Sequence, residues 1–396
     1  MRRSRSHSRR RLRRLMLSGI TLVLIASCLQ LSGCEQFGAR PEGDAYLRVS
    51  QSENYDAGID QFVNLDPDVL DEMSENMSFW SDPVEFMKSG FAFFSNKNQT
   101  RPDQPLPEVR SLPDDFGNSA GNVKFTWLGH ATVLMSIDNK TILVDPTFSP
   151  SAAPVSWAVK RFQPPAIDLE SLPKIDAIII SHDHYDHLDM DTIKHFITTE
   201  TTFFVPLGVG AHLIRWGVPA SRITELDWWQ STRLDGLEFI CMPAQHFSGR
   251  IGLFHNQTSL WASWMVKSSS NSVYFSGDSG YADHYRMIGE RYGPFDLVFM
   301  DAGQYNPRWR QVHNLPDEAV QAFEDLRGKA MVPTGWGMFT LALHDWFEPA
   351  VLVDRMGAER GLDVIIPRLG ALVDMSARQA PDRWWEPLVS KKKDSQ

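Results

Sequence analysis

The fold of this chain is constrained most by a cluster of metal-binding side chains that directly follows an apolar run. Residues 177–180 are Ala-Ile-Ile-Ile, a short aliphatic run that is typical of a buried strand. Residues 181–189 follow at once and read Ser-His-Asp-His-Tyr-Asp-His-Leu-Asp. Imidazole nitrogen and carboxylate oxygen are the ligands that zinc and similar divalent ions prefer. The sequence therefore predicts a metal site on a loop at the end of a buried strand.

The spacing within this segment separates two pairs of ligands. His182 and His184 are two residues apart, so in an extended turn both imidazoles point to the same side and can hold one metal ion. Asp186 and His187 follow once the chain bends, and they can face a second ion. A solvated polar loop is the alternative interpretation, but the pattern H-x-H-x-D-H directly after an aliphatic strand favours a metal site.

This motif resembles that of a known superfamily. His182-x-His184-x-Asp186-His187 is similar to the metal motif of the metallo-β-lactamase superfamily, whose fold is an αββα sandwich with a dinuclear metal site. The resemblance covers about Asn122 to Pro387 and is greatest to the branch that contains N-acyl phosphatidylethanolamine phospholipase D. It implies an α/β (α+β) fold of the αββα type. It also implies two divalent metal ions; zinc, iron and manganese all accept such ligands, and zinc is the one we expect.

Two further strand-like segments end in single candidate ligands. His246 follows the alternating segment 237–242, within a Pro-Ala-Gln-His sequence that resembles the same branch. Asp278 follows segment 272–275, between glycines that allow a tight turn. A core histidine and a turn aspartate without a metal are the alternatives. The resemblance implies that the first metal is held by His182, His184 and His246, the second by Asp186, His187 and His344, and that Asp278 bridges the two.

Three more residues are candidates for supporting or catalytic roles. Asp145, in Leu-Val-Asp-Pro, resembles a carboxylate that orients the ligands from behind. His130 can reach the site from a neighbouring strand end, or it can be a structural hydrogen-bonding residue. His313 resembles a family histidine close to the substrate, with a structural role as the alternative. Asp278 can also shuttle a proton to the leaving group. The remaining histidines of the body are expected to lie on the surface or in packing positions: His195, His212, His255 and His284.

Residues 1–33 are expected to be a signal peptide. Eight arginines lie between Arg2 and Arg14, and an apolar run from Leu15 leads to Leu-Ser-Gly-Cys, which ends at Cys34. This arrangement resembles a bacterial lipoprotein signal, with cleavage before Cys34 and lipid attached to its sulfur. An uncleaved signal anchor is the alternative, because the run is near the lower length limit for a membrane span. Both place the chain in the cell envelope facing the periplasm; Glu35 after the cysteine favours the outer membrane.

The net charge and the cysteine content indicate which partners and which disulfide bonds can be expected for this chain. Without the eight arginines the chain has 31 basic and 49 acidic residues, a formal charge of −18. We therefore expect no nucleic-acid partner. Loss of Cys28 with the signal and acylation of Cys34 leave Cys241, so no disulfide can form within one mature chain. Cys241 lies in an alternating strand and is expected to be a core residue rather than a catalytic thiol.

The composition and the apolar pattern of the sequence change near Asn122. Residues 34–121 are rich in Asp, Pro, Ser and Asn without a sustained period, which predicts a linker and an N-terminal arm. The aromatic segment Phe79 to Phe94 can pack on the core or touch lipid. Residues 122–390 are expected to form the hydrolase domain. Its predicted strands include 123–127, 132–137, 141–144, 297–301 and 329–333, and its predicted helices are 190–198, 209–216, 317–326 and 350–360.

The resemblance implies a metal-dependent hydrolase of phospholipase D type. Its expected reaction is phosphodiester cleavage of N-acyl phosphatidylethanolamine or a related lipid, which releases N-acylethanolamine and phosphatidic acid. One alternative is a lactonase or a β-lactamase-like amide or ester hydrolase on the same dinuclear site. Another is a non-catalytic, lipid-binding lipoprotein of the envelope. The complete set of ligands favours an enzyme, with a lipid or small-molecule ester as its substrate and a membrane anchor at its N-terminus.

Overall fold

Two stacked β-sheets form the centre of the protein. The computed structural model describes residues 35–77, 97–250, 257–378 and 380–389. The expected signal peptide, Cys34 and the aromatic segment Phe79 to Phe94 lie outside these ranges, and so does His255. Among the described residues, no helix combines the length and the apolar character that a membrane span requires.

Among the described residues, the first sheet has seven strands and the second has six. The strand order in the first is β15 (Leu372–Asp374), β3 (Val123–Trp127), β4 (Val133–Ile137), β5 (Lys140–Val144), β6 (Ala177–Ile179), β7 (Thr202–Pro206) and β8 (Ile223–Leu226). In the second it is β14 (Met331–Thr334), β13 (Leu297–Asp301), β12 (Ser272–Phe275), β11 (Ser263–Lys267), β10 (Leu237–Met242) and β9 (Ser231–Leu234). The strands predicted from the sequence are confirmed, with ends that differ by at most two residues.

Alternation of apolar side chains explains why the sheets stack. Successive residues of a strand point to opposite faces, and in β10 both faces are apolar. Phe239 and Cys241 belong to the core between the two sheets, whereas Ile240 belongs to the core beneath the helices. Across the sandwich, the ring of Phe239 stacks on that of Phe204 with 4.3 Å between centroids. Sheets that are buried on both faces need a covering layer on each side.

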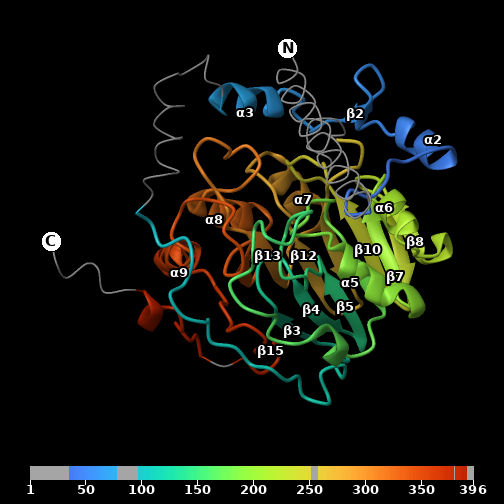
Figure 1. The fold of residues 1–396 in the computed structure, drawn as a ribbon. Coiled ribbons are helices and arrows are strands. Elements are labelled where there is room, and N and C mark those ends of the chain that lie inside the picture. Colours follow the sequence, from blue (N-terminus) through green and yellow to red (C-terminus); the bar gives the residue numbers. More distant parts are fainter. Residues whose placement is uncertain (1–34, 78–96, 251–256, 379, 390–396) are drawn as a thin grey trace, which may run out of the picture.

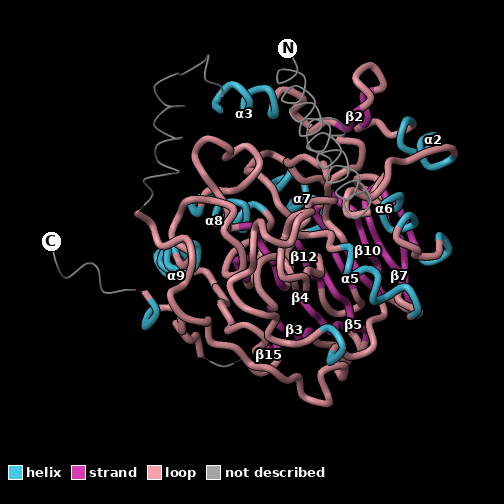
Figure 2. Tube along the Cα trace, viewed as in Figure 1, coloured by secondary structure: helices cyan, strands magenta, loops and turns pink. Residues whose placement is uncertain are grey.

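Helices supply the two outer layers (Figures 1 and 2). On the seven-stranded sheet, α5 (Met190–His195) and α6 (Gly210–Arg215) contribute apolar residues to its outer core. On the six-stranded sheet, apolar residues of the outer core come from α7 (His284–Tyr292), α8 (Pro316–Asp325) and α9 (Glu348–Arg360). The α-helix predicted over 190–198 ends at His195, and a 3-10 turn follows over Phe196–Thr198. The observed architecture is the predicted αββα sandwich.

The N-terminal arm has more structure than its composition indicated. It contains α2 (Asp44–Ser50), a hairpin of β1 (Tyr55–Asp56) and β2 (Gln61–Phe62), and α3 (Val69–Met77). Phe62 is fully buried, and its N–H donates to the carbonyl of Gln257 at 2.8 Å. At the start of the arm, the indole N–H of Trp216 donates to the carbonyl of Glu35 at 2.7 Å. In Figure 1 the arm, in blue, runs over one end of the sandwich.

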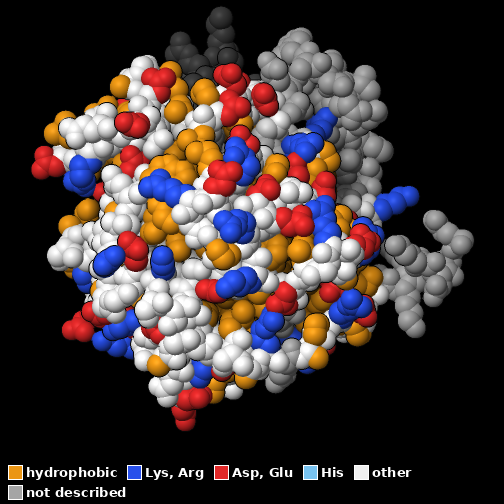
Figure 3. Space-filling model, turned by 180° about the vertical axis from the view of Figure 1, so that it is seen from behind, with side chains coloured by type: hydrophobic (Ala, Val, Ile, Leu, Met, Phe, Trp, Pro, Cys, Tyr) orange, Lys and Arg blue, Asp and Glu red, His pale blue; other side chains and the backbone are white. Residues whose placement is uncertain are grey.

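The surface carries both signs of charge. On the face drawn in Figure 3, lysine and arginine side chains are interspersed with aspartate and glutamate rather than gathered in one patch. Pairs such as Lys329 and Asp296, whose Nζ and Oδ1 atoms are 2.7 Å apart, are typical of this surface.

The position of Cys241 leads to a first prediction. Its side chain is fully buried between the sheets, and Sγ lies 3.6 Å from the carbonyl oxygen of Leu226. Replacing Cys241 with alanine removes one buried atom, so we expect the free energy of unfolding to fall by about 1 kcal/mol. Urea denaturation measures this change, with an unaltered m-value as the sign that the fold is retained. A loss above about 3 kcal/mol would contradict a simple packing role.

Candidate metal centre

The loops that follow several strands meet at one end of the sandwich. The segment 181–189 follows β6, and Asp145 directly follows β5, the parallel neighbour of β6. In the other sheet, His246 comes after β10 and Asp278 after β12. Carboxyl ends of parallel strands lie at the same edge of a sheet, and ligands commonly bind there. The topology thereby brings together residues that are more than a hundred positions apart in the sequence.

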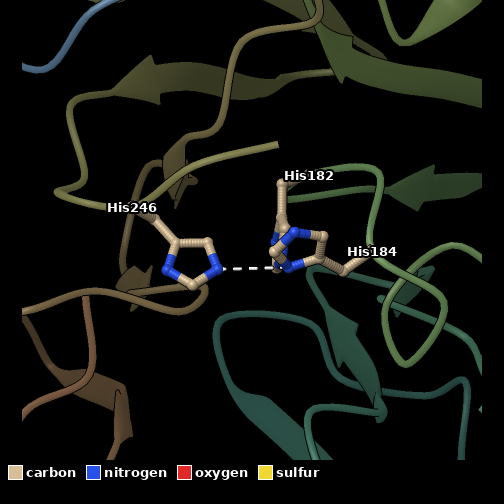
Figure 4. Close-up of side chains that lie close together, drawn as sticks. All are labelled: His182, His184 and His246. Atoms are coloured by element: carbon tan, nitrogen blue, oxygen red, sulfur yellow. Dashed lines mark hydrogen bonds between the residues drawn. The ribbon is translucent and has the colours of Figure 1, made fainter. Parts of the chain in front are cut away.

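Three histidines form the first group. Nε2 of His182 lies 2.8 Å from Nδ1 of His184, and Nε2 of His246 lies 3.2 Å from the same Nδ1 atom. Figure 4 shows the three rings turned toward one another, with the contact between His246 and His184 drawn as a dashed line. Nitrogen ligands of a tetrahedral zinc ion are about 3.3 Å apart, given Zn–N bonds of about 2.0–2.1 Å. The three nitrogens therefore suit one ion.

A second group lies beside the first and contains two carboxylates. Oδ2 of Asp186 is 2.7 Å from Nε2 of His130 and 3.5 Å from Nε2 of His187. Oδ2 of Asp278 lies 3.0 Å from that same His187 nitrogen. It is also 4.0 Å from Nε2 of His182 and 3.9 Å from Nε2 of His246. One oxygen of Asp278 therefore faces both groups, which is the position that a bridging ligand needs.

The donor atoms fit divalent cations. Nε2 of His187 is buried and has no hydrogen-bond partner among the described residues, although two carboxylates flank it. A buried polar atom without a partner is rare and needs an explanation, and a metal ion provides one here. The set of imidazoles and carboxylates matches zinc and related ions. Within the part of the chain that the structure describes, four groups of three residues have ligand atoms close enough together to share an ion: His182, His184 and His246; His130, Asp186 and His187; His182, His187 and Asp278; His246, Asp278 and His313.

Hydrogen bonds behind the cluster hold the rings in place. Oδ2 of Asp145 accepts a hydrogen bond from Nδ1 of His187 at 2.8 Å, and its carboxylate also accepts from the N–H and the hydroxyl of Ser181. Nδ1 of His246 donates to the carbonyl of Val312 at 2.9 Å. In both histidines Nε2 is left to face the cluster. Such partners fix the tautomer and the ring orientation of metal-binding histidines. Asp145 has the location predicted for it.

Burial and charge set the protonation of these groups. Burial and the neighbouring histidines lower the pKa of His182 well below its usual value, so its lone pair is available. For Asp278, burial favours the neutral acid, but His187 and other histidines outweigh it and lower its pKa well below the usual range. For His187, burial opposes protonation, but the carboxylates of Asp278, Asp186 and Asp145 outweigh it and raise its pKa. The surroundings of His187 therefore favour positive charge.

His313 lies closer to the cluster than its predicted role requires, and His344 lies outside it. Nε2 of His313 is 3.8 Å from Oδ2 of Asp278, and its Nδ1 donates to Oδ2 of Asp301 at 3.0 Å. Burial lowers the pKa of His313, but Asp301 and Asp278 outweigh it and raise it to about 9. His344 is in none of the four groups. Its Nε2 accepts the backbone N–H of Gln304 at 3.0 Å, and its Nδ1 lies 2.8 Å from the carbonyl of Asp345.

The other histidines have packing or surface positions where the structure describes them. His212 is buried, and its Nε2 lies 3.2 Å from Oδ2 of Asp183. His284 is buried beside the ring of Tyr285, and His195 is exposed. These placements agree with the sequence analysis.

Sequence reasoning missed two residues of the arm that reach the site. Asn64 makes hydrogen bonds with the backbone of His246 at 2.9 and 3.0 Å. Met73 of α3 lines a pocket of about 280 Å³ that opens beside the metal cluster. The arm has no periodic apolar pattern, so nothing in the sequence indicated which of its side chains would contact the loops.

Comparisons with known proteins agree with this geometry. Residues 140–336 match the family described as Beta-lactamase superfamily domain. The chain is 36% identical to the N-acyl-phosphatidylethanolamine-hydrolyzing phospholipase D 1 of Caenorhabditis elegans, over 62% of this chain and 72% of that protein. It is 48% identical to the outer membrane protein RomA of Klebsiella pneumoniae, over 25% of this chain and 74% of that protein.

A solved structure shares the fold. The isothiocyanate hydrolase from Delia radicum gut bacteria superposes with a TM-score of 0.52 at 17% identity, over 63% of this chain and 98% of that one. The sandwich, the histidine and aspartate groups at its edge and the related sequences agree with one another. The chain therefore belongs to the metallo-β-lactamase superfamily, as a metal-dependent hydrolase related to N-acyl phosphatidylethanolamine-hydrolysing phospholipases D.

Proposed function

We propose that the protein is a phospholipase D-type phosphodiesterase whose substrate is N-acyl phosphatidylethanolamine or a closely related lipid. The observation that carries the proposal is an apolar pocket that opens directly onto the candidate metal cluster. The relative from Caenorhabditis elegans, which is named for hydrolysis of that lipid, supports the same substrate class.

The pocket combines two kinds of lining. Its volume is about 280 Å³, near the lower end of the range for ligand pockets. Five of the lining residues belong to the cluster: His184, Asp186, His246, Asp278 and His313. Apart from Gln304, the other lining residues have largely apolar side chains: Met73, Phe247, Trp309, Val312 and Leu341. A phosphodiester would contact the cluster residues, and the first part of an acyl chain would contact the apolar residues. An amphiphilic ester suits this arrangement better than a wholly polar one.

The proposed ligand sets follow the groups seen at the sheet edge. His182, His184 and His246 would hold the first ion, and Asp186 and His187 the second, with Asp278 between them. His344 is proposed as a further ligand of the second ion, which requires its Nε2 to leave the N–H of Gln304. Bound divalent ions would activate water near neutral pH and polarise the phosphoryl oxygens.

The chain's own residues would orient the substrate and move protons. Asp145 and His130 would hold His187 and Asp186 in position. Asp278 and His313 would be the catalytic groups, because both line the pocket that opens beside the metal cluster. Water would form the new bond to phosphorus while the bond from phosphorus to the ethanolamine oxygen breaks. The proton that the water loses would pass by way of Asp278 or His313 to that oxygen, which gives N-acylethanolamine and phosphatidic acid.

We also propose an envelope location and two-part organisation for the mature chain. Residues 1–33 would be removed, Cys34 would carry lipid, residues 34–121 would form the arm, and 122–390 the hydrolase domain. The tether would hold the site near its substrate at the periplasmic face of a membrane. The relative named as an outer membrane protein supports an envelope location.

Purified protein loaded with zinc provides the direct test. N-acyl phosphatidylethanolamine in mixed micelles should be converted to N-acylethanolamine and phosphatidic acid, which mass spectrometry resolves. In ¹⁸O-labelled water the label should appear in phosphatidic acid. Intact lipid, together with hydrolysis of a lactone or a β-lactam, would instead favour the second candidate reaction. Binding of the lipid without turnover, unaffected by replacement of His184 with alanine, would favour a non-catalytic lipoprotein.

Leu341 gives a prediction about acyl-chain recognition. Its side chain lines the pocket and is 39% exposed, so contact with an acyl chain would remove the remaining apolar surface from water. Replacing Leu341 with serine should raise KM for a long-chain substrate about 5-fold, equivalent to about 1 kcal/mol of lost apolar contact. The value of kcat should change little. Kinetics with long- and short-chain lipids measure this difference.

Leu372 provides the matched control. It is 37% exposed, in the edge strand β15 and outside the pocket. Leu372→Ser should leave KM unchanged for both lipids. If Leu341→Ser and the unaltered protein have equal KM values for the long-chain lipid, the acyl chain does not bind in this pocket.

A further inference from the structure

Asn64 of the N-terminal arm lies against the backbone of His246. Its Nδ2 donates to the carbonyl oxygen of His246 at 2.9 Å, and its Oδ1 accepts the backbone N–H of His246 at 3.0 Å. His246 lies four residues beyond the end of β10, where the sheet ladder no longer supplies partners. One amide side chain therefore satisfies both backbone groups of this residue, as a neighbouring strand would.

The surroundings of Asn64 determine which way its amide points. Its side chain is buried, with 5% of the residue exposed. Oδ1 accepts a second hydrogen bond from the indole N–H of Trp261 at 3.0 Å. Two N–H groups thus point at one end of the amide and a carbonyl at the other, so the reverse orientation would leave like groups facing one another. The contact is specific to an amide with the length of asparagine.

The ring of His246 is held independently of its backbone. Its Nδ1 donates to the carbonyl of Val312 at 2.9 Å, which leaves Nε2 facing Nδ1 of His184 at 3.2 Å. Asn64 holds the main chain and Val312 holds the ring, so together they determine where Nε2 lies. A ligand atom must be placed to within about half an ångström for metal binding, and groups behind the ligands provide that accuracy.

We propose that Asn64 is a positioning residue for the metal ligand His246, so that the N-terminal arm is a working part of the metal centre. The inference rests on the proposed metal site, but it does not depend on which ester the protein hydrolyses. A second contact of the same arm agrees with it, because Met73 of α3 lines the pocket next to His246.

Metal binding by Asn64 variants tests the proposal. Asn64→Ala removes both hydrogen bonds, and we expect the affinity for the ion held by His246 to fall about 10- to 100-fold, the usual effect of losing a partner behind a ligand. Competition with a chromophoric chelator measures the affinity. The visible absorption of the cobalt-loaded protein should also change, because it reports the geometry of the ligands. In lipid hydrolysis, kcat should fall while KM stays within about 2-fold.

Two further variants make the result decisive. Asn64→Asp keeps the volume and the acceptor but places an oxygen against the carbonyl of His246, so it should also weaken metal binding. If the alanine variant does not fold, the metal affinity of Asn64→Asp tests the proposal instead. Asn54→Ala is the matched control, since Asn54 belongs to the same arm and donates instead to Oδ1 of Asp227 at 2.8 Å. Its metal affinity and cobalt spectrum should be those of the unaltered protein.

The measurements distinguish failure of the proposed role of Asn64 from failure of the proposed substrate. Unchanged metal affinity and cobalt spectrum in both Asn64 variants would overturn the proposal, and so would an equal loss in Asn54→Ala. If the unaltered protein binds two ions but leaves N-acyl phosphatidylethanolamine intact, the proposed substrate fails while the role of Asn64 can still be decided by metal affinity.

Discussion

Replacing Asp278 with asparagine will lower hydrolysis by more than about 10³-fold and will reduce the amount of tightly bound metal. The physical reason is the position of one oxygen atom. Oδ2 of Asp278 lies 3.0 Å from Nε2 of His187, and 3.8–4.0 Å from the nearest nitrogens of three further histidines. An amide in its place keeps the shape but removes the negative charge that two adjacent cations need.

Metal analysis after dialysis, thermal unfolding and hydrolysis rates together measure this effect. Bound ions stabilise the folded state, so a chelator should lower the melting temperature of the unaltered protein. That shift should be smaller in Asp278→Asn. Asp283→Asn serves as the control, because Asp283 lies five residues further on and its carboxylate is exposed beside Arg286. Two tightly bound ions and more than a tenth of the normal rate in Asp278→Asn would refute the bridging role.

Most residues of the candidate metal cluster could be predicted because their positions depend on local structure. His182, His184 and Asp278 each follow a strand within a few residues, and hydrogen-bonded ladders place strand ends accurately. The apolar pattern of the preceding strands, together with the glycines on both sides of Asp278, was therefore sufficient to predict where these residues lie. The αββα sandwich was predicted from the resemblance of the metal motif, and it agrees with the structure, in which β10 has apolar side chains on both faces.

Long loops and the arm could not be placed in the same way. His344 is on the long segment between β14 and α9, and its ring position depends on a hydrogen bond with Gln304, forty residues away in the sequence. His313 was predicted near the substrate, and its approach to Asp278 depends on Asp301 at the end of β13. Asn64 acts through one hydrogen-bonded contact in a segment without a period. Such positions are set by tertiary contacts that leave no pattern in the sequence.

Replacing Asp145 with asparagine is expected to lower metal affinity and hydrolysis by a factor between about 10² and 10⁴ without unfolding the protein. Asp145 is fully buried, and its Oδ1 accepts the backbone N–H of Ser181 at 2.7 Å. This backbone donor forces the oxygen of an asparagine to remain at the Oδ1 position. The amide NH₂ group must then face Nδ1 of His187, where the carboxylate now accepts a hydrogen bond at 2.8 Å.

The consequence is a change of tautomer. An NH₂ group can donate to Nδ1 only when that nitrogen carries no proton, so neutral His187 would carry its proton on Nε2. Nε2 is the atom that faces Asp186 and Asp278, and a protonated nitrogen cannot bind a metal ion. The second ion should therefore be lost first, which chelator competition and the cobalt spectrum can detect. Shape and burial are conserved, so the fold should remain.

Asp176→Asn separates this effect from general damage to the strand pair. Asp176 lies at the opposite end of β6, and its Oδ2 accepts the backbone N–H of Thr141 at 2.9 Å, so it caps the same two strands without contact to the cluster. We expect its metal affinity and rate to match those of the unaltered protein. Normal binding of both ions in Asp145→Asn would mean that His187 is not a ligand through Nε2, because no other arrangement of the amide satisfies the N–H of Ser181.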